Sequence, residues 1–366
     1  MINLSFFPSR RLALYMVRLF FTRSLAVLFA LVLILMTLDL LGESGKILAV
    51  PGNGDTELWH YVALRLPILV SRFLPFSVLL GALIAFVGLN QHSEVVAMKA
   101  AGLSAHQILA PLVVASFGIS VTLFAFNETG VVKSTRVVTA WSDNDYKPVP
   151  PSSGVLSSVW LLNGDDLTRA GLVVGRPPNL RAERIVIYDR ANGVLQRVVN
   201  AARALPLPGG KWKLEDVRVY DATMNVTRRY PQMTGMDGVT PSQLTLAKVD
   251  PTELDYWTLK QRAAELEAAG RPADEARAGL AHKISGPLST LLMPLLAAVA
   301  AFGLARSGQV LMRATLGMAL GFAYFVADNF SLAMGNAGAY PPLIAAWAPF
   351  LLFLLIGETV LVRTEE

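Results

Sequence analysis

A short polar segment between two long apolar runs carries the side chains of this sequence that are best suited to chemistry. Residues 90–109 read NQHSEVVAMKAAGLSAHQIL and place Glu94 and Lys99 between FLPFSVLLGALIAFVGL and APLVVASFGISVTLFAF. Ser93 is a candidate N-cap, and the charge of Glu94 suits the first turn of a helix. Gly102 suits the position after the last turn, and Ser104 with Gln107 predicts a capping box that opens the next helix.

This pattern predicts a helix of about two turns over residues 93–101. Its apolar side chains are Val95, Val96 and Met98, and Glu94 is its fixed anion. The alternative is a bent loop whose charges only face water.

Other chemistry finds little support in the sequence. The two Gly-Lys pairs, Gly45-Lys46 and Gly210-Lys211, lack the rest of a phosphate-binding loop. The four histidines are scattered without metal-ligand spacing, and the absence of cysteine excludes disulfides and thiolate nucleophiles. We therefore expect no metal, no cofactor and no enzymatic activity of this chain alone.

The elements that hold the polar segment are membrane spans. Of the 366 residues 53% are hydrophobic and 16% are charged, against about 25% charged in ordinary soluble proteins. A span needs about 20 apolar residues. Six segments qualify: Leu14–Leu41, Val62–Leu89, Ala105–Phe126, Ile284–Leu304, Ala314–Met334 and Pro342–Leu361.

The distribution of basic residues predicts the orientation of these spans. Arginines precede the first span and follow the last one, and Lys99 lies between the second and the third. The loop after the fifth span, GNAGAYPP, carries no charge. By the positive-inside rule, both termini and the Glu94 segment are cytoplasmic, and the polar stretch after the third span lies outside.

That polar stretch contains strand signals. RIVIYDR, the turn ANG and VLQRVVN follow one another, and KWKLEDVRVY comes after PGG. Such alternation with glycine-rich turns predicts an antiparallel β domain. The expected organisation is three spans in residues 1–128, a β domain in 129–254, a connecting helix in 255–280 and three spans in 281–366.

Charged residues near the outer ends of the spans are candidates for binding an anionic ligand, because charge in a membrane span is costly. They are Lys46, Arg65, Arg72, Lys133, Arg136 and Lys283. The simpler interpretation is interfacial snorkelling or local pairing, such as Asp39 with Arg72. Apolar candidates for an adjoining cavity include Phe73, Phe76, Phe322 and Phe325, which face lipid or other helices in the simpler interpretation.

Several stretches together resemble the permease family of the lipopolysaccharide-export ABC transporter, LptF/LptG. SEVVAMKAAG resembles its coupling helix, and LDLLGE, HKISGPLS, GFAYFVADN and YPPLIAAWAP fit the first, fourth, fifth and sixth spans. The last three are more similar to the LptG type. One departure is that Met36, Gly42 and Glu43 stand where LptG-type relatives tend to carry lysine, which leaves Lys46 as the nearest cation.

The resemblance implies a jellyroll-like periplasmic domain and a role for each candidate residue. Glu94 would engage an arginine of a cytoplasmic ATPase dimer, a contact that is bidentate and directional. Ser93 would begin the coupling helix, and Val95 and Met98 would fill a groove in the ATPase. The six cations would meet lipid A phosphates and core sugars.

The function implied is that of a permease subunit in the inner membrane of a Gram-negative bacterium. It would pair with an LptF-type permease, extract lipopolysaccharide from the outer leaflet and pass it to periplasmic bridge proteins, while the partner ATPase binds ATP. One alternative is a force-transmitting permease of the MacB or FtsX kind, although those usually have four spans. The other is a lipid-modifying enzyme, although residues 129–279 contain no histidine.

Overall fold

The structure is a computed structural model of the chain. It describes residues 8–148, 156–175, 180–191, 193–208, 210–221, 226–246, 249–268, 270–302 and 310–363. By contacts the chain divides into two compact units. The transmembrane unit comprises Met1–Gly42, Val62–Ser134 and Pro251–Glu366, and the β unit comprises Glu43–Tyr61 and Thr135–Asp250.

Within the described ranges six helical segments are long and apolar enough to cross a membrane, which confirms the predicted spans. They are α1 (Arg10–Leu48), α2 (Asp55–Gln91), α4 (Ala105–Phe126) with its continuation to Asp143, α8 (Asp274–Phe302), α9 (Val310–Asn336) and α10 (Pro342–Arg363). Most are longer than the apolar runs that predicted them, because polar residues at the ends keep their backbone hydrogen bonds by continuing the helix.

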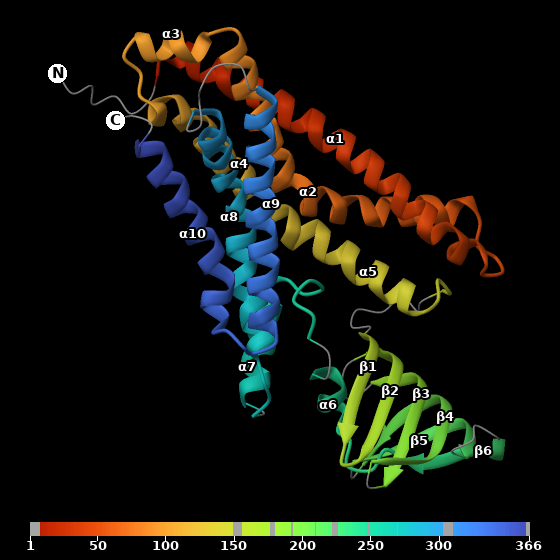
Figure 1. The fold of residues 1–366 in the computed structure, drawn as a ribbon. Coiled ribbons are helices and arrows are strands. Elements are labelled where there is room, and N and C mark those ends of the chain that lie inside the picture. Colours follow the sequence, from red (N-terminus) through yellow and green to blue (C-terminus); the bar gives the residue numbers. More distant parts are fainter. Residues whose placement is uncertain are drawn as a thin grey trace. The chain divides into compact units, whose positions relative to one another are not determined.

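Helices α4, α8, α9 and α10 pack around one apolar core in the transmembrane unit (Figure 1). Small residues bring α2 and α9 close together, since a Cβ built on Gly321 would lie 1.9 Å from Leu79 Cδ2 and one on Gly317 would lie 2.5 Å from Leu83 Cδ2. Helices in a bilayer associate through such close packing, because lipid chains are as apolar as the side chains.

A close approach that involves backbone joins α1 to α2. A Cβ on Gly81 would lie 2.1 Å from Ser24 Oγ and 2.5 Å from Ser24 Cα. The second of these contacts is with backbone, so rotation of the serine side chain cannot relieve it. Only glycine at position 81 allows the two helices to cross at this distance.

Gly81→Val is therefore expected to force α1 away from α2 and to destabilise the protein by about 1–3 kcal/mol or more, the usual effect of overpacking. The midpoint of thermal unfolding in detergent measures this. Gly88→Val is the matched control, because a Cβ at Gly88 of the same helix meets nothing within 4 Å. Equal melting temperatures for the two variants would contradict the close crossing.

The described part of the β unit contains six antiparallel strands, and their order in the sheet follows the chain order (Figure 1). They are β1 (Leu156–Asn163), β2 (Asp166–Val174), β3 (Arg181–Ala191), β4 (Val194–Leu207), β5 (Lys211–Asp221) and β6 (Val226–Gly235). The predicted turns are confirmed: Gly193 (φ 76°) precedes β4 and Gly210 (φ 72°) precedes β5. One face of the sheet is covered by an apolar core that includes Trp212 and Leu244, the latter from α6 (Pro241–Leu246).

The polar stretch is not wholly β. After a short π-helical turn, η1 (Asn127–Val131), the chain continues as α5 (Val132–Asp143). Within the β unit α5 buries Ala140 against Leu172 and Val174 of β2. Trp141 packs edge-on against Tyr146, and the Tyr146 hydroxyl donates a 2.7 Å hydrogen bond to Glu43. The C-terminal end of α1 is thus joined to the segment that leads into the sheet.

Candidate functional site

The segment with Glu94 is helical, as predicted. Helix α3 (Glu94–Ala100) lies between α2 and α4 and is followed by Gly102 in a left-handed conformation (φ 86°). The predicted capping box of α4 is present: Gln107 N donates to Ser104 Oγ at 3.1 Å, and Ser104 N donates to the Gln107 side chain at 3.0 Å. Ser93 precedes α3 in a left-handed conformation (φ 58°), and its side chain makes no capping hydrogen bond.

The carboxylate of Glu94 has a partner within the chain. The Tyr15 hydroxyl of α1 donates a 3.2 Å hydrogen bond to Glu94 Oε1. Sequence reasoning missed Tyr15, because 79 positions separate the two residues and only the crossing of α1 over α2 brings them together.

The apolar side chains of α3 divide between two directions. Val95 (4% exposed) and Met98 (8% exposed) belong to the core of the transmembrane unit, whereas Val96 is 66% exposed. Val95 and Met98 are therefore covered by this chain and are not open to a groove in another protein. A helix of seven residues in an otherwise apolar environment must bury one side, and here that side is the one predicted to face outward.

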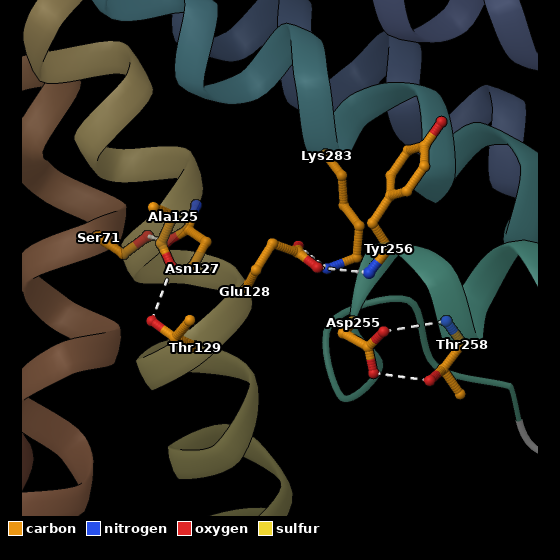
Figure 2. A network of polar contacts seen from close by, with 9 residues as sticks. All are labelled: Ser71, Ala125, Asn127, Glu128, Thr129, Asp255, Tyr256, Thr258 and Lys283. Atoms are coloured by element: carbon orange, nitrogen blue, oxygen red, sulfur yellow. Dashed lines mark hydrogen bonds and ion pairs between the residues drawn. The ribbon is translucent and has the colours of Figure 1, made fainter.

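Two of the predicted ligand-binding cations are engaged by carboxylates. Arg65 donates to both oxygens of Asp39, from Nε at 2.9 Å and from Nη2 at 3.0 Å, so the suggested pairing of Asp39 with Arg72 is wrong. Lys283 Nζ lies 2.7 Å from Glu128 Oε1, with the two side chains 11% and 15% exposed. Figure 2 shows Lys283 and the Tyr256 amide both directed at the Glu128 carboxylate.

The neighbourhood of Glu128 is fixed by further polar contacts in the transmembrane unit (Figure 2). The Ser71 hydroxyl of α2 donates to Asn127 Oδ1 at 2.5 Å. Asp255 caps α7 (Tyr256–Ala268) by accepting from the Thr258 amide at 3.0 Å and from its hydroxyl at 2.7 Å. Burial opposes ionisation of Asp255, but the hydrogen bonds from Thr258 outweigh it and leave the pKa of this carboxyl below its usual value.

The other predicted cations are more open. Lys46 is 65% exposed and pairs with Glu43, 2.9 Å away on the same helix. Arg72 and Lys133 are exposed, and Arg136 is half-buried. These residues stay candidates for an anionic ligand.

A third polar pair joins α8 to α9. His282 Nε2 lies 3.1 Å from Asp328 Oδ2, and the aspartate side chain is 14% exposed. The position of Asp328 within an apolar span was a signal for a partner, but the sequence did not indicate which residue it was.

The predicted phenylalanines differ in exposure. Phe73 and Phe76 are half-buried, while Phe322 (62% exposed) and Phe325 (44% exposed) point away from the chain. An open apolar groove is instead lined by Leu80, Leu83, Ile84 and Val87 of α2 and by Met318 of α9. Within the described ranges no three His, Asp or Glu side chains gather in a way that could hold a metal ion.

Comparison with known proteins agrees with this architecture. The sequence profile of the family described as "Lipopolysaccharide export system permease LptF/LptG" matches residues 14–363. The permease LptG of Escherichia coli strain K12 is 28% identical over 316 residues, which cover 83% of this chain and 84% of the relative. LptG of Haemophilus influenzae is 24% identical over 325 residues, covering 86% and 89%. With its six span-length helices and its inserted antiparallel sheet, this chain belongs to the LptF/LptG family of lipopolysaccharide export permeases.

Proposed function

We propose that this chain is the LptG-type permease subunit of an ABC exporter that removes lipopolysaccharide from the outer leaflet of the inner membrane. The observation that carries the proposal is α3, a short helix with a carboxylate in its first turn, placed between two span-length helices of a chain that matches this family over residues 14–363. The relatives named LptG support the G type over the F type.

The energy would come from a separate cytoplasmic ATPase dimer. Glu94 engages an arginine of that ATPase, and Val96 is the apolar side chain of α3 that faces it, because Val95 and Met98 are buried. Since α3 packs into the core of the transmembrane unit, a displacement of α3 is passed to the helices around it. Nucleotide favours a collapsed state of the exporter and bound lipid an open one, so that ATP binding expels the lipid.

The lipid cavity would form with an LptF-type partner, mainly through α1 and α9. In the most apolar stretch of α1, only 11% of the residues are buried within this chain. In the corresponding stretch of α8, 78% are buried. Phe322 and Phe325 of α9 are exposed in the same way. Such surfaces fit a helix of a second permease on one side and the acyl chains of a lipid on the other.

Phosphate groups of lipid A would be bound by the more exposed cations. Lys46, Arg72 and Lys133 fit this role better than Arg65 and Lys283, which are held by carboxylates. In this orientation both termini are cytoplasmic and the β unit is periplasmic, where its edge strands add to periplasmic bridge proteins of similar fold.

Reconstitution tests the proposal. The chain is co-expressed with a candidate LptF-type permease and the ATPase, placed in lipid vesicles with lipopolysaccharide, and supplied with ATP. We expect co-purification of the three proteins and ATP-dependent transfer of lipopolysaccharide to a soluble bridge protein. ATPase docking without lipid transfer would favour a force-transmitting permease, and turnover of a lipid by this chain alone would favour an enzyme.

A further inference from the structure

The outer face of the sheet, opposite the apolar core, carries an unusual row of side chains. Directly opposite partners in adjacent strands point to the same face of a sheet. Beginning at Trp160 of β1 and ending at β6, successive partners define what we call the outer row: Trp160, Arg169, Val186, Asn200, Arg218 and Arg229. The neighbouring residues Val159, Ile185 and Val217 are buried in the core on the other face.

One end of the outer row is aromatic. Trp160 is 46% exposed, and its ring is stacked with that of Tyr188, with 6.3 Å between the centroids and 12° between the planes. Arg169 Cζ lies 5.5 Å from the centroid of the Trp160 ring. The Nε atom of Arg169 is covered, and it has no hydrogen-bond partner in the described part of the chain. Trp160 is thus a partly exposed aromatic side chain held between a second ring and a guanidinium group.

The other end is basic. Arg218 and Arg229 are direct cross-strand partners, and both are exposed. Like charges in directly opposite positions destabilise a sheet. Among the described residues neither arginine has a carboxylate within ion-pair distance, and between them and Arg169 the covered Oδ1 of Asn200 also lacks a partner. Packing of the β unit does not explain the two exposed arginines, whereas an anionic ligand does.

We propose that the outer row binds an acidic oligosaccharide. Its sugar rings lie against the exposed part of Trp160, which offers an apolar surface, and its phosphate or carboxylate groups bind Arg218 and Arg229 through charge-assisted hydrogen bonds. Strands are about 4.8 Å apart, so the row is roughly 24 Å long, enough for several sugar units. Identification of this ligand with the saccharide part of the exported lipid rests on the proposed function.

Binding of two probes to the full-length protein in detergent tests the inference. The probes are the delipidated, phosphorylated core oligosaccharide of lipopolysaccharide and lipid A without core sugars. We expect Trp160→Ala, and the double variant Arg218→Gln/Arg229→Gln, to weaken oligosaccharide binding by about five- to tenfold. Lipid A binding is expected to stay unchanged. The loss caused by the arginine variant should shrink as salt is raised.

The matched control is Trp257→Ala with Lys260→Gln on α7. It removes a tryptophan that is more exposed than Trp160 (73% against 46%) and has a cation 6.0 Å from its ring, on a helix of the transmembrane unit. A wild-type protein that does not bind the oligosaccharide, or row variants that bind it as the wild type does, would overturn the inference. So would loss of a periplasmic protein partner with unchanged oligosaccharide binding, because the row would then be a protein-docking surface. Failure to bind lipid A speaks against the proposed function alone.

Discussion

Glu94→Gln is expected to weaken association of the permease with its ATPase by about tenfold or more, and Glu94→Lys to abolish it. Removing one member of a charge pair at an interface typically costs about 2–5 kcal/mol, which corresponds to a factor of roughly 30 or more. The measurement is the amount of ATPase retained with the permease in detergent, together with ATP hydrolysis after reconstitution. The fold should survive, because Glu94 is not buried and its partner in the chain is one tyrosine hydroxyl.

The matched control for Glu94→Gln is Gln91→Lys. It changes the net charge by the same amount three positions away, on an exposed residue at the end of α2. Tyr15→Phe is expected to have a smaller effect in the same direction, since it removes only the hydrogen bond that orients the carboxylate. Equal ATPase retention by wild type, Glu94→Gln and Glu94→Lys would show that α3 does not dock through this charge.

The sequence was sufficient to predict α3 but not the side that it buries. Its boundaries follow from Glu94, Gly102 and the capping box after it, which are local signals. Val95, Val96 and Met98 are all apolar, however, and lie within one turn or so of each other. Which of them is buried depends on how α3 lies against the core of the transmembrane unit, and no local pattern contains that information.

The pairing of Asp39 illustrates a similar gap. Counting residues along each helix from its predicted cytoplasmic end favoured Arg72 as the partner of Asp39, because such a count treats each helix as a separate straight rod. The close crossing at Ser24 and Gly81 is the point from which residues on the two helices should be counted. Asp39 lies 15 residues beyond Ser24, and Arg65 lies 16 residues before Gly81, so the two side chains are at the same distance from the crossing. Arg72 is only nine residues from Gly81 and cannot reach that level.

In the β unit the predicted hairpins were those with glycine turns. Strands β3, β4 and β5 are separated by the turns at Gly193 and Gly210. The sequence pattern did not predict α5. The chain continues there as a helix because Ala140 is covered by the sheet and Trp141 packs against Tyr146. That contact depends on the folded β unit. The outer row was equally hidden, since cross-strand register brings its members together from six separate strands.

Lys283→Met is expected to destabilise the protein by about 3 kcal/mol or more, because it leaves the Glu128 carboxylate without its cation at a site that is largely closed to water. The charged group would still accept from the Tyr256 amide (Figure 2), which compensates only in part. Glu128→Gln combined with Lys283→Met should be clearly more stable than Lys283→Met, since replacing both members of a buried pair is often nearly neutral. Unfolding midpoints in detergent of the two single variants and the double variant measure this coupling.

Lys46→Met provides the comparison with an exposed pair. Lys46 and Glu43 are also 2.9 Å apart, but Lys46 is 65% exposed, and such a pair contributes at most about 1 kcal/mol. Lys46 and Lys283 were both predicted to bind phosphate. Measuring lipid binding as well as the unfolding midpoint of the same two variants therefore distinguishes a stabilising role of each lysine from a role in ligand binding. If Lys283 holds α8 to the η1 turn, Lys283→Met lowers the unfolding midpoint far more than Lys46→Met. If Lys283→Met instead keeps the wild-type midpoint and loses lipid binding, the role of Lys283 is to bind the lipid and not to stabilise the fold through its ion pair with Glu128.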